Sequence, residues 1–297
     1  MKMPARKSRI RPLQQRLLAL GAASAMLGWG IANAQNGAAQ IGIAAAVVSE
    51  VKLSNAQSPN PKTVSVRQRI ALADLIQTGK DGRLQVLLLD RSTFTIGPNS
   101  VLRIDRFVYD PSRGRTSAAS VTRGAFRFMS GQSNRGNSAA ISSPVATIGI
   151  RGTILEGVVG PGARDIAKRE DKAVREADAD KRTATLVVLR GPGPGTEPGA
   201  EIGSASVTSG GVTVELTEPM QAAYVPRAGA VPIGPFRISP AGLSGLHGQV
   251  FSDPAGGGGL GKALLGGALG ILPSVINGGG KRSAPGPNDP AGGAVKP

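Results

Sequence analysis

The most constraining feature of the chain is a series of short β-forming runs between residues 74 and 153, separated by turn residues. Turn signals such as Asp81-Gly82, Gly97-Pro98 and Asp110-Pro111 recur roughly every 8 to 15 residues. No helical period of useful length interrupts them between residues 40 and 160. This spacing predicts an all-β fold, a sandwich or roll of short antiparallel strands.

Single runs refine this picture. The run from Leu84 to Leu89 is apolar on both faces, which is typical of a central strand in a sandwich. Asp81-Gly82, just before it, favours a hairpin turn. Residues 101–106 alternate between an apolar and a charged face, and we expect Arg103 and the later Arg127 to be exposed.

The residues that usually perform catalysis or hold metals are scarce. The chain has no Cys and one His, His247, in a Gly-rich region, which excludes thiol chemistry and argues against a zinc site or a His-dependent triad. Ser92, Ser100 and Ser130 have no candidate base nearby in sequence. We therefore predict no catalytic residue, no cofactor and no metal; an enzyme of unfamiliar type is the remaining alternative.

The first 34 residues predict export. A basic start, the apolar stretch Leu17 to Leu27 and the small-x-small step Ala32-Asn33-Ala34 follow in the order of a secretory signal peptide. We expect cleavage and a periplasmic protein. The alternative is an inner-membrane anchor, since the uncharged stretch continues to about Gly42.

The remaining chain divides by composition. We expect a β domain at residues 41–158, a charged insertion at 161–183, accessory β strands at 184–238 and a disordered Gly/Pro-rich tail at 239–297. The insertion has a thin apolar face, with little beyond Ile166 and Val174, and predicts a solvated helix or a disordered loop.

Net charge bears on partners. Removing the six basic residues of the signal peptide from a chain of formal charge +16 leaves +10. This excess favours an anionic cell-wall polymer as a partner, with plain solubility as the alternative. We expect no nucleic-acid partner, and the sequence does not indicate an oligomeric state.

Several phrases occur together in one order: Asp74-x-x-x-Thr78-Gly79-x-Asp81-Gly82-Arg83, then Asp90-Arg91-Ser92, then Gly97-Pro98-Asn99-Ser100. Gly124-Ala125-Phe126-Arg127-Phe128 follows, and the series closes on Pro144-Val145-Ala146-Thr147-Ile148-Gly149-Ile150-Arg151-Gly152-Thr153. This series resembles the FecR domain over roughly residues 45–158. The signature residues are Asp74, Thr78, Gly79, Asp81, Gly82, Arg83, Gly97, Gly124, Pro144, Arg151, Gly152 and Thr153.

The resemblance implies a β-rich periplasmic domain that senses or relays signals through protein contacts. Well-known members regulate a sigma factor from a cytoplasmic N-terminal part, but only 16 residues precede the apolar segment here. We therefore expect a non-enzymatic exported protein that binds an envelope protein in signalling or assembly. The alternatives are a cell-wall or acidic-glycan binding module and a membrane-anchored regulator of sigma-factor signalling.

Individual signature residues have competing roles. Arg151 is either a recognition point or a structural residue that pairs with an acid such as Asp81 or Asp90. The acids Asp74, Asp81 and Asp90 are interpreted as turn-forming side chains rather than Ca²⁺ ligands, because no spaced Asp-x-Asp-x-Asp loop occurs.

Overall fold

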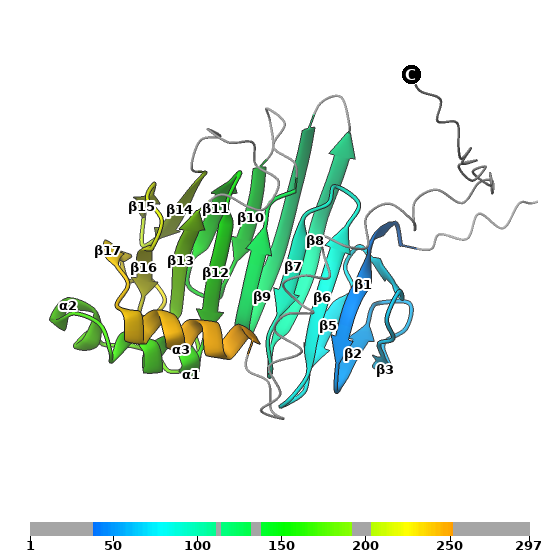
Figure 1. The fold of residues 1–297 in the computed structure, drawn as a ribbon, viewed down its shortest axis with the longest axis horizontal. Coiled ribbons are helices and arrows are strands. Elements are labelled where there is room, and N and C mark those ends of the chain that lie inside the picture. Colours follow the sequence, from blue (N-terminus) through cyan, green and yellow to red (C-terminus); the bar gives the residue numbers. More distant parts are fainter. Residues whose placement is uncertain (1–37, 111–113, 132–137, 192–202, 252–297) are drawn as a thin grey trace, which may run out of the picture. The chain divides into compact units, whose positions relative to one another are not determined.

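The computed structural model of the protein describes residues 38–110, 114–131, 138–191 and 203–251 (Figure 1). The predicted signal peptide and residues 252–297 of the predicted tail lie outside the described residues.

Two nine-stranded sheets make up the domain. In spatial order, sheet A consists of β4 (Arg69–Ala71), β1 (Gln40–Val48), β6 (Arg83–Leu88), β7 (Thr93–Ile96), the second half of β9 (Gly114–Met129), β12 (Ile154–Val159), β13 (Thr185–Gly191), β16 (Gln221–Val225) and β17 (Ile233–Arg237). The predicted central strand therefore lies inside this sheet as β6, between β1 and β7.

Sheet B has a matching order. It consists of β3 (Lys62–Thr63), β2 (Val51–Ser54), β5 (Leu75–Thr78), β8 (Val101–Asp110), the first half of β9, β10 (Ser138–Ser142), β11 (Thr147–Arg151), β14 (Ser204–Ser209) and β15 (Val212–Leu216). Among the described strands, β9 and β10 form the one parallel pair; the others are antiparallel.

Strand β9 belongs to both sheets. Its residues up to Arg123 pair with β8, and those from Gly124 onward pair with β12. The change occurs at Gly124, whose φ of 92° is open to glycine at little cost. Elsewhere the chain passes between the sheets through short corners, so successive strands often belong to different sheets.

The space between the sheets holds the main core. Its buried side chains come from both sheets, for example Val86 and Phe94 from sheet A and Leu102 and Ile148 from sheet B. The core is mostly aliphatic, and the rings of Phe94 and Phe128 lie 4.7 Å apart between their centroids within it. The structure thus confirms the predicted all-β sandwich.

Three helices form a third layer on the outer face of sheet A: α1 (Pro161–Ala167), α2 (Lys172–Arg175) and α3 (Pro240–Phe251) (Figure 1). Strand β13 is buried on both faces as a result, with Val187 in the inter-sheet core and Leu186 and Val188 under the helices. No helix in the described ranges has the length and hydropathy that a membrane span requires.

Three expectations are corrected. Asp81-Gly82 is no hairpin turn, because β5 lies in sheet B and β6 in sheet A. Residues 161–183 are not a solvated insertion, since their few apolar residues, Ile166 and Val174 among them, are buried on sheet A. The unpacked tail does not begin at Ser239, because α3 follows and buries Leu246.

Candidate functional site

The central signature residues lie in corners that stack at one end of the sandwich. The corner between β5 and β6 bonds to the corner between β1 and β2 through the Gly79 amide, which donates to the carbonyl of Glu50 over 2.8 Å. The corner between β7 and β8 joins the same stack, since the Asn99 amide donates to the carbonyl of Gly79 over 3.0 Å. The Gly97 amide then donates to the carbonyl of Ala125, next to the bend of β9, over 2.8 Å.

Two buried hydroxyls fasten this stack. Thr78 Oγ1 donates to the carbonyl of Gly97 over 2.7 Å and accepts from the Ser100 amide over 2.8 Å. Ser100 Oγ in turn accepts from the amide of Ala125 over 3.1 Å. Buried backbone groups need such partners, so these side chains act on the scaffold rather than on a ligand.

Close backbone approach explains the glycines. A Cβ at Gly82 would lie 2.1 Å from the carbonyl oxygen of Glu50, and one at Gly124 would lie 2.0 Å from Ser100 Oγ. Arg83 is buried below this corner, and its Nη1 donates to the carbonyl of Asp81 over 3.5 Å. The phrase around Asp81 therefore forms a corner that holds two sheets together.

The closing phrase forms a similar junction at the opposite end of the strands. Thr153 is fully buried after Gly152, which has a φ of 59°. Thr153 Oγ1 donates to the carbonyl of Gly191 over 2.7 Å, and its amide donates to Ser130 Oγ over 3.3 Å. The residue links the end of β9 to the end of β13.

The predicted turn role of the acids is confirmed for two of them. Asp74 accepts from the Ala71 amide and from the Asn55 side chain, each over 2.7 Å. Asp90 Oδ1 accepts from the amide and the hydroxyl of Ser92. Within the described part of the chain, no cluster of three or more His, Asp or Glu side chains could hold a metal ion.

The remaining signature residues lie at the surface. Pro144 is exposed in the loop between β10 and β11, and Arg151 is exposed at the end of β11. Among the described residues, Arg151 forms no ion pair with Asp81 or Asp90, so the proposed pairing with those acids is not found. Its role as a recognition point stays a prediction.

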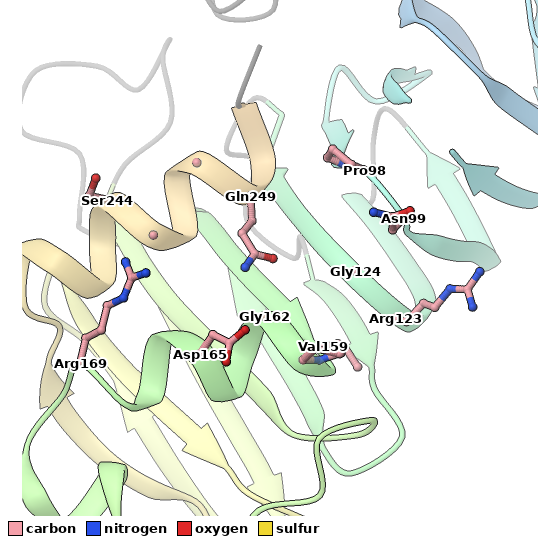
Figure 2. A pocket seen from close by; sticks show the side chains of 13 residues that line it. Pro98, Asn99, Arg123, Gly124, Val159, Gly162, Asp165, Arg169, Ser244 and Gln249 are labelled. Carbon is pink, nitrogen blue, oxygen red and sulfur yellow. The ribbon is translucent and has the colours of Figure 1, made fainter. Parts of the chain in front are cut away.

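A cleft of about 850 Å³ opens above the first group of corners (Figure 2). Its floor consists of the turn at Pro98-Asn99 and the bend of β9 at Arg123-Gly124. Helices α1 and α3 form its walls, which are the elements that the sequence analysis did not place there. The other lining residues are Val159, Pro161, Gly162, Asp165, Arg169, Ser244, Gly245, Gly248 and Gln249.

Polar groups converge on this cleft. The side chain of Gln249 points from α3 toward α1, where a Cβ on Gly162 would lie 2.2 Å from its Oε1 (Figure 2). Arg123 and Arg169 lie at opposite ends of the cleft, and Asp165 pairs with the exposed Lys168 over 3.0 Å. Glycine walls leave backbone amides and carbonyls open to a ligand, which suits an extended peptide.

A buried charge cluster lies beside the cleft, under the C-terminal half of α3. Glu156 of β12 is fully buried, and its carboxylate lies 3.0 Å from Arg127 and 3.8 Å from Arg190. Burial lowers the pKa of Arg127 from its ordinary value, and the Glu156 carboxylate opposes that shift. Arg127 also stacks over the ring of Phe251 at 5.5 Å, so it is not the exposed residue that the strand pattern predicted.

His247 lies on α3 near this cluster. Its ring centroid is 4.6 Å from that of Phe251. Burial lowers its pKa from the ordinary value of 6.5, the Glu156 carboxylate opposes this, and Arg190 and Arg127 add to it. Sequence reasoning missed Glu156, although an acid inside the otherwise apolar run Ile154–Val159 is a signal for a buried, paired charge.

Comparison with known proteins gives one family. The model of the family described as FecR protein matches residues 74–191, so it begins later than expected and continues through α1, α2 and β13. No curated protein matches the chain.

Two solved structures illustrate the distance to known folds. A crystal structure described as a putative anti-sigma factor from Parabacteroides distasonis is 14% identical, with 54% of this chain aligned to 57% of that one and a TM-score of 0.35. A cell surface anchoring domain is 17% identical over 22% of this chain and 83% of its own, with a TM-score of 0.21. The chain thus spans little more than half of the first structure, and these likenesses carry no argument here.

Proposed function

We propose that this protein, whose residues 74–191 form a FecR domain, is a non-enzymatic binding module for an envelope protein in signalling or assembly. We further propose that it works outside the cytoplasm, on the strength of the basic, apolar and small-residue order of residues 1–34.

The cleft between α1 and α3 is the observation that carries this proposal. It has the size of a binding pocket and a polar, glycine-rich wall, but its lining holds neither a candidate nucleophile with a base nor a pair of carboxylates. The nearest buried carboxylate outside it, Glu156, is engaged by two arginines. Such a site binds rather than transforms.

The signature corners support this assignment from below. Their hydroxyls and amides bond to one another, so they fix the floor of the cleft without facing a partner. Partner contact is then left to the cleft side chains, above all Arg123, Arg169 and Gln249.

In-cell photo-crosslinking tests the proposal. A photoreactive residue at the exposed position Ser244, on the rim of the cleft, should capture one dominant envelope protein. The matched control is Thr208, an exposed residue on the outer face of sheet B, which should not capture it.

The outcomes separate the alternatives. The same adducts from both positions, or none from Ser244, would remove the cleft from consideration. Adducts made of cell-wall polymer alone would replace the protein partner with the anionic-glycan reading.

A further inference from the structure

The outer face of sheet A continues beyond the helical layer. Helices α1 and α3 pack against β9, β12 and β13, whereas β6 and β7 lie past the end of α3 (Figure 1). On this face, Gln85, Thr95, Arg127 and Glu156 follow one another in register across β6, β7, β9 and β12. They form one polar row under and beyond the last turn of α3.

The residues of β6 and β7 on this face are buried although they are polar. Gln85 is 3% exposed, Thr93 is 3% and Thr95 is 4%. Their neighbours Val86 and Phe94 point into the inter-sheet core, so the polar side chains point away from it. A sheet face that is so well buried needs a cover, and the described helices do not extend over it.

The end of α3 indicates which segment supplies that cover. Gln249 and Phe251 lie over β7 and β9: a Cβ on Gly97 would be 2.4 Å from the Gln249 carbonyl oxygen, and Arg127 stacks on Phe251. The chain therefore leaves the helix at the border of the polar row. Two strand spacings of ~4.8 Å separate β9 from β6, which about three extended residues span.

We propose that residues 252–259, Ser-Asp-Pro-Ala-Gly-Gly-Gly-Gly, dock across the outer face of β7 and β6 as a built-in cover. Small side chains let a backbone approach a sheet closely, and its amides and carbonyls find partners in the row of Thr and Gln side chains. Charge is complementary as well: two arginines share the one carboxylate of Glu156, and Asp253 brings a second acid two residues past Phe251.

Cysteine protection tests this docking, because the chain contains no Cys of its own. In the full chain, Thr95→Cys should react with a maleimide slowly, and a chain that ends at Phe251 should react roughly tenfold faster or more. Thr208→Cys, exposed on sheet B, should react fast in both chains. Equal rates for Thr95→Cys in the two chains would overturn the proposal, as would protection that is lost only when residues 1–34 are removed.

A second measurement avoids truncation. In the full chain, Thr95→Cys combined with Ala255→Cys should form a disulfide under mild oxidation, whereas Thr208→Cys combined with Ala255→Cys should not. Absence of the first cross-link, or equal yields from both pairs, would show that residues 252–259 do not lie on β7.

Discussion

Replacement of Gly124 by alanine probes the point where β9 passes from sheet B to sheet A. At a φ of 92° a Cβ costs roughly 1–2 kcal/mol, as for other left-handed residues. The new methyl would also lie 2.0 Å from Ser100 Oγ and 2.5 Å from Ser100 Cα, an overlap that adds about 1–3 kcal/mol. We expect Gly124→Ala to lower the free energy of unfolding by about 2–5 kcal/mol in chemical denaturation.

Gly211→Ala is the matched control. Gly211 has a comparable φ of 77° in the turn between β14 and β15, but nothing lies within 4 Å of its Cβ position. It should lose only the backbone part, about 1–2 kcal/mol. Equal losses for the two variants would refute the argument that close packing of the corners fixes Gly124.

Four other substitutions have defined outcomes in the same denaturation assay. Leu246→Ala should cost about 2–5 kcal/mol, because it empties a fully buried site under α3. Thr78→Val should cost about 1–3 kcal/mol, since it leaves buried backbone groups without their hydroxyl partner. Glu156→Ala should cost about 3–5 kcal/mol, because two arginines lose their counter-charge. Stability should fall as the pH drops below about 6.5, where the unfolded chain protonates His247 before the folded chain does, and His247→Gln should remove that component.

The two sheets were predictable because their signal is local. Alternation along a run such as Leu84 to Leu89 states which face is buried, and turn residues state where a strand ends. Sheet membership was not predictable in the same way. Asp81-Gly82 has the composition of a hairpin turn, but its conformation is set by the carbonyl of Glu50, which is distant in sequence and bonds to Gly79.

Helix α3 shows how tertiary contacts override propensity. Its three internal glycines cost roughly 1 kcal/mol each against alanine, which made the segment read as unpacked. A Cβ at Gly242 would lie 1.8 Å from Glu170 Oε1, so a larger residue cannot fit there. Burial of Leu246, Val250 and Phe251, at about 1.5–3 kcal/mol each, outweighs that cost.

One local signal for α3 was present and was missed. Ser239-Pro240 is the pair that often begins a helix, with a capping hydroxyl followed by proline at the first helical position. The structure uses it: Ser239 Oγ accepts from the Gly242 amide over 3.0 Å and donates to Glu170 Oε1 over 2.8 Å. The charged segment at 161–183 thus holds the start of α3 through Glu170, which is why neither segment is an appendage.

The division of labour in the domain follows from where hydrogen-bonding capacity is spent. Thr78, Ser100 and Thr153 use their hydroxyls on backbone groups within the sandwich, so they are not available to a partner. A signature of this kind fixes corners and therefore specifies a fold rather than a ligand. The side chains of Arg123 and Gln249 line the cleft outside that bonding, and there a partner's chemistry can be read. Substitutions in the corners should therefore reduce partner capture only together with stability, whereas Gln249→Ala should reduce capture more than it reduces stability.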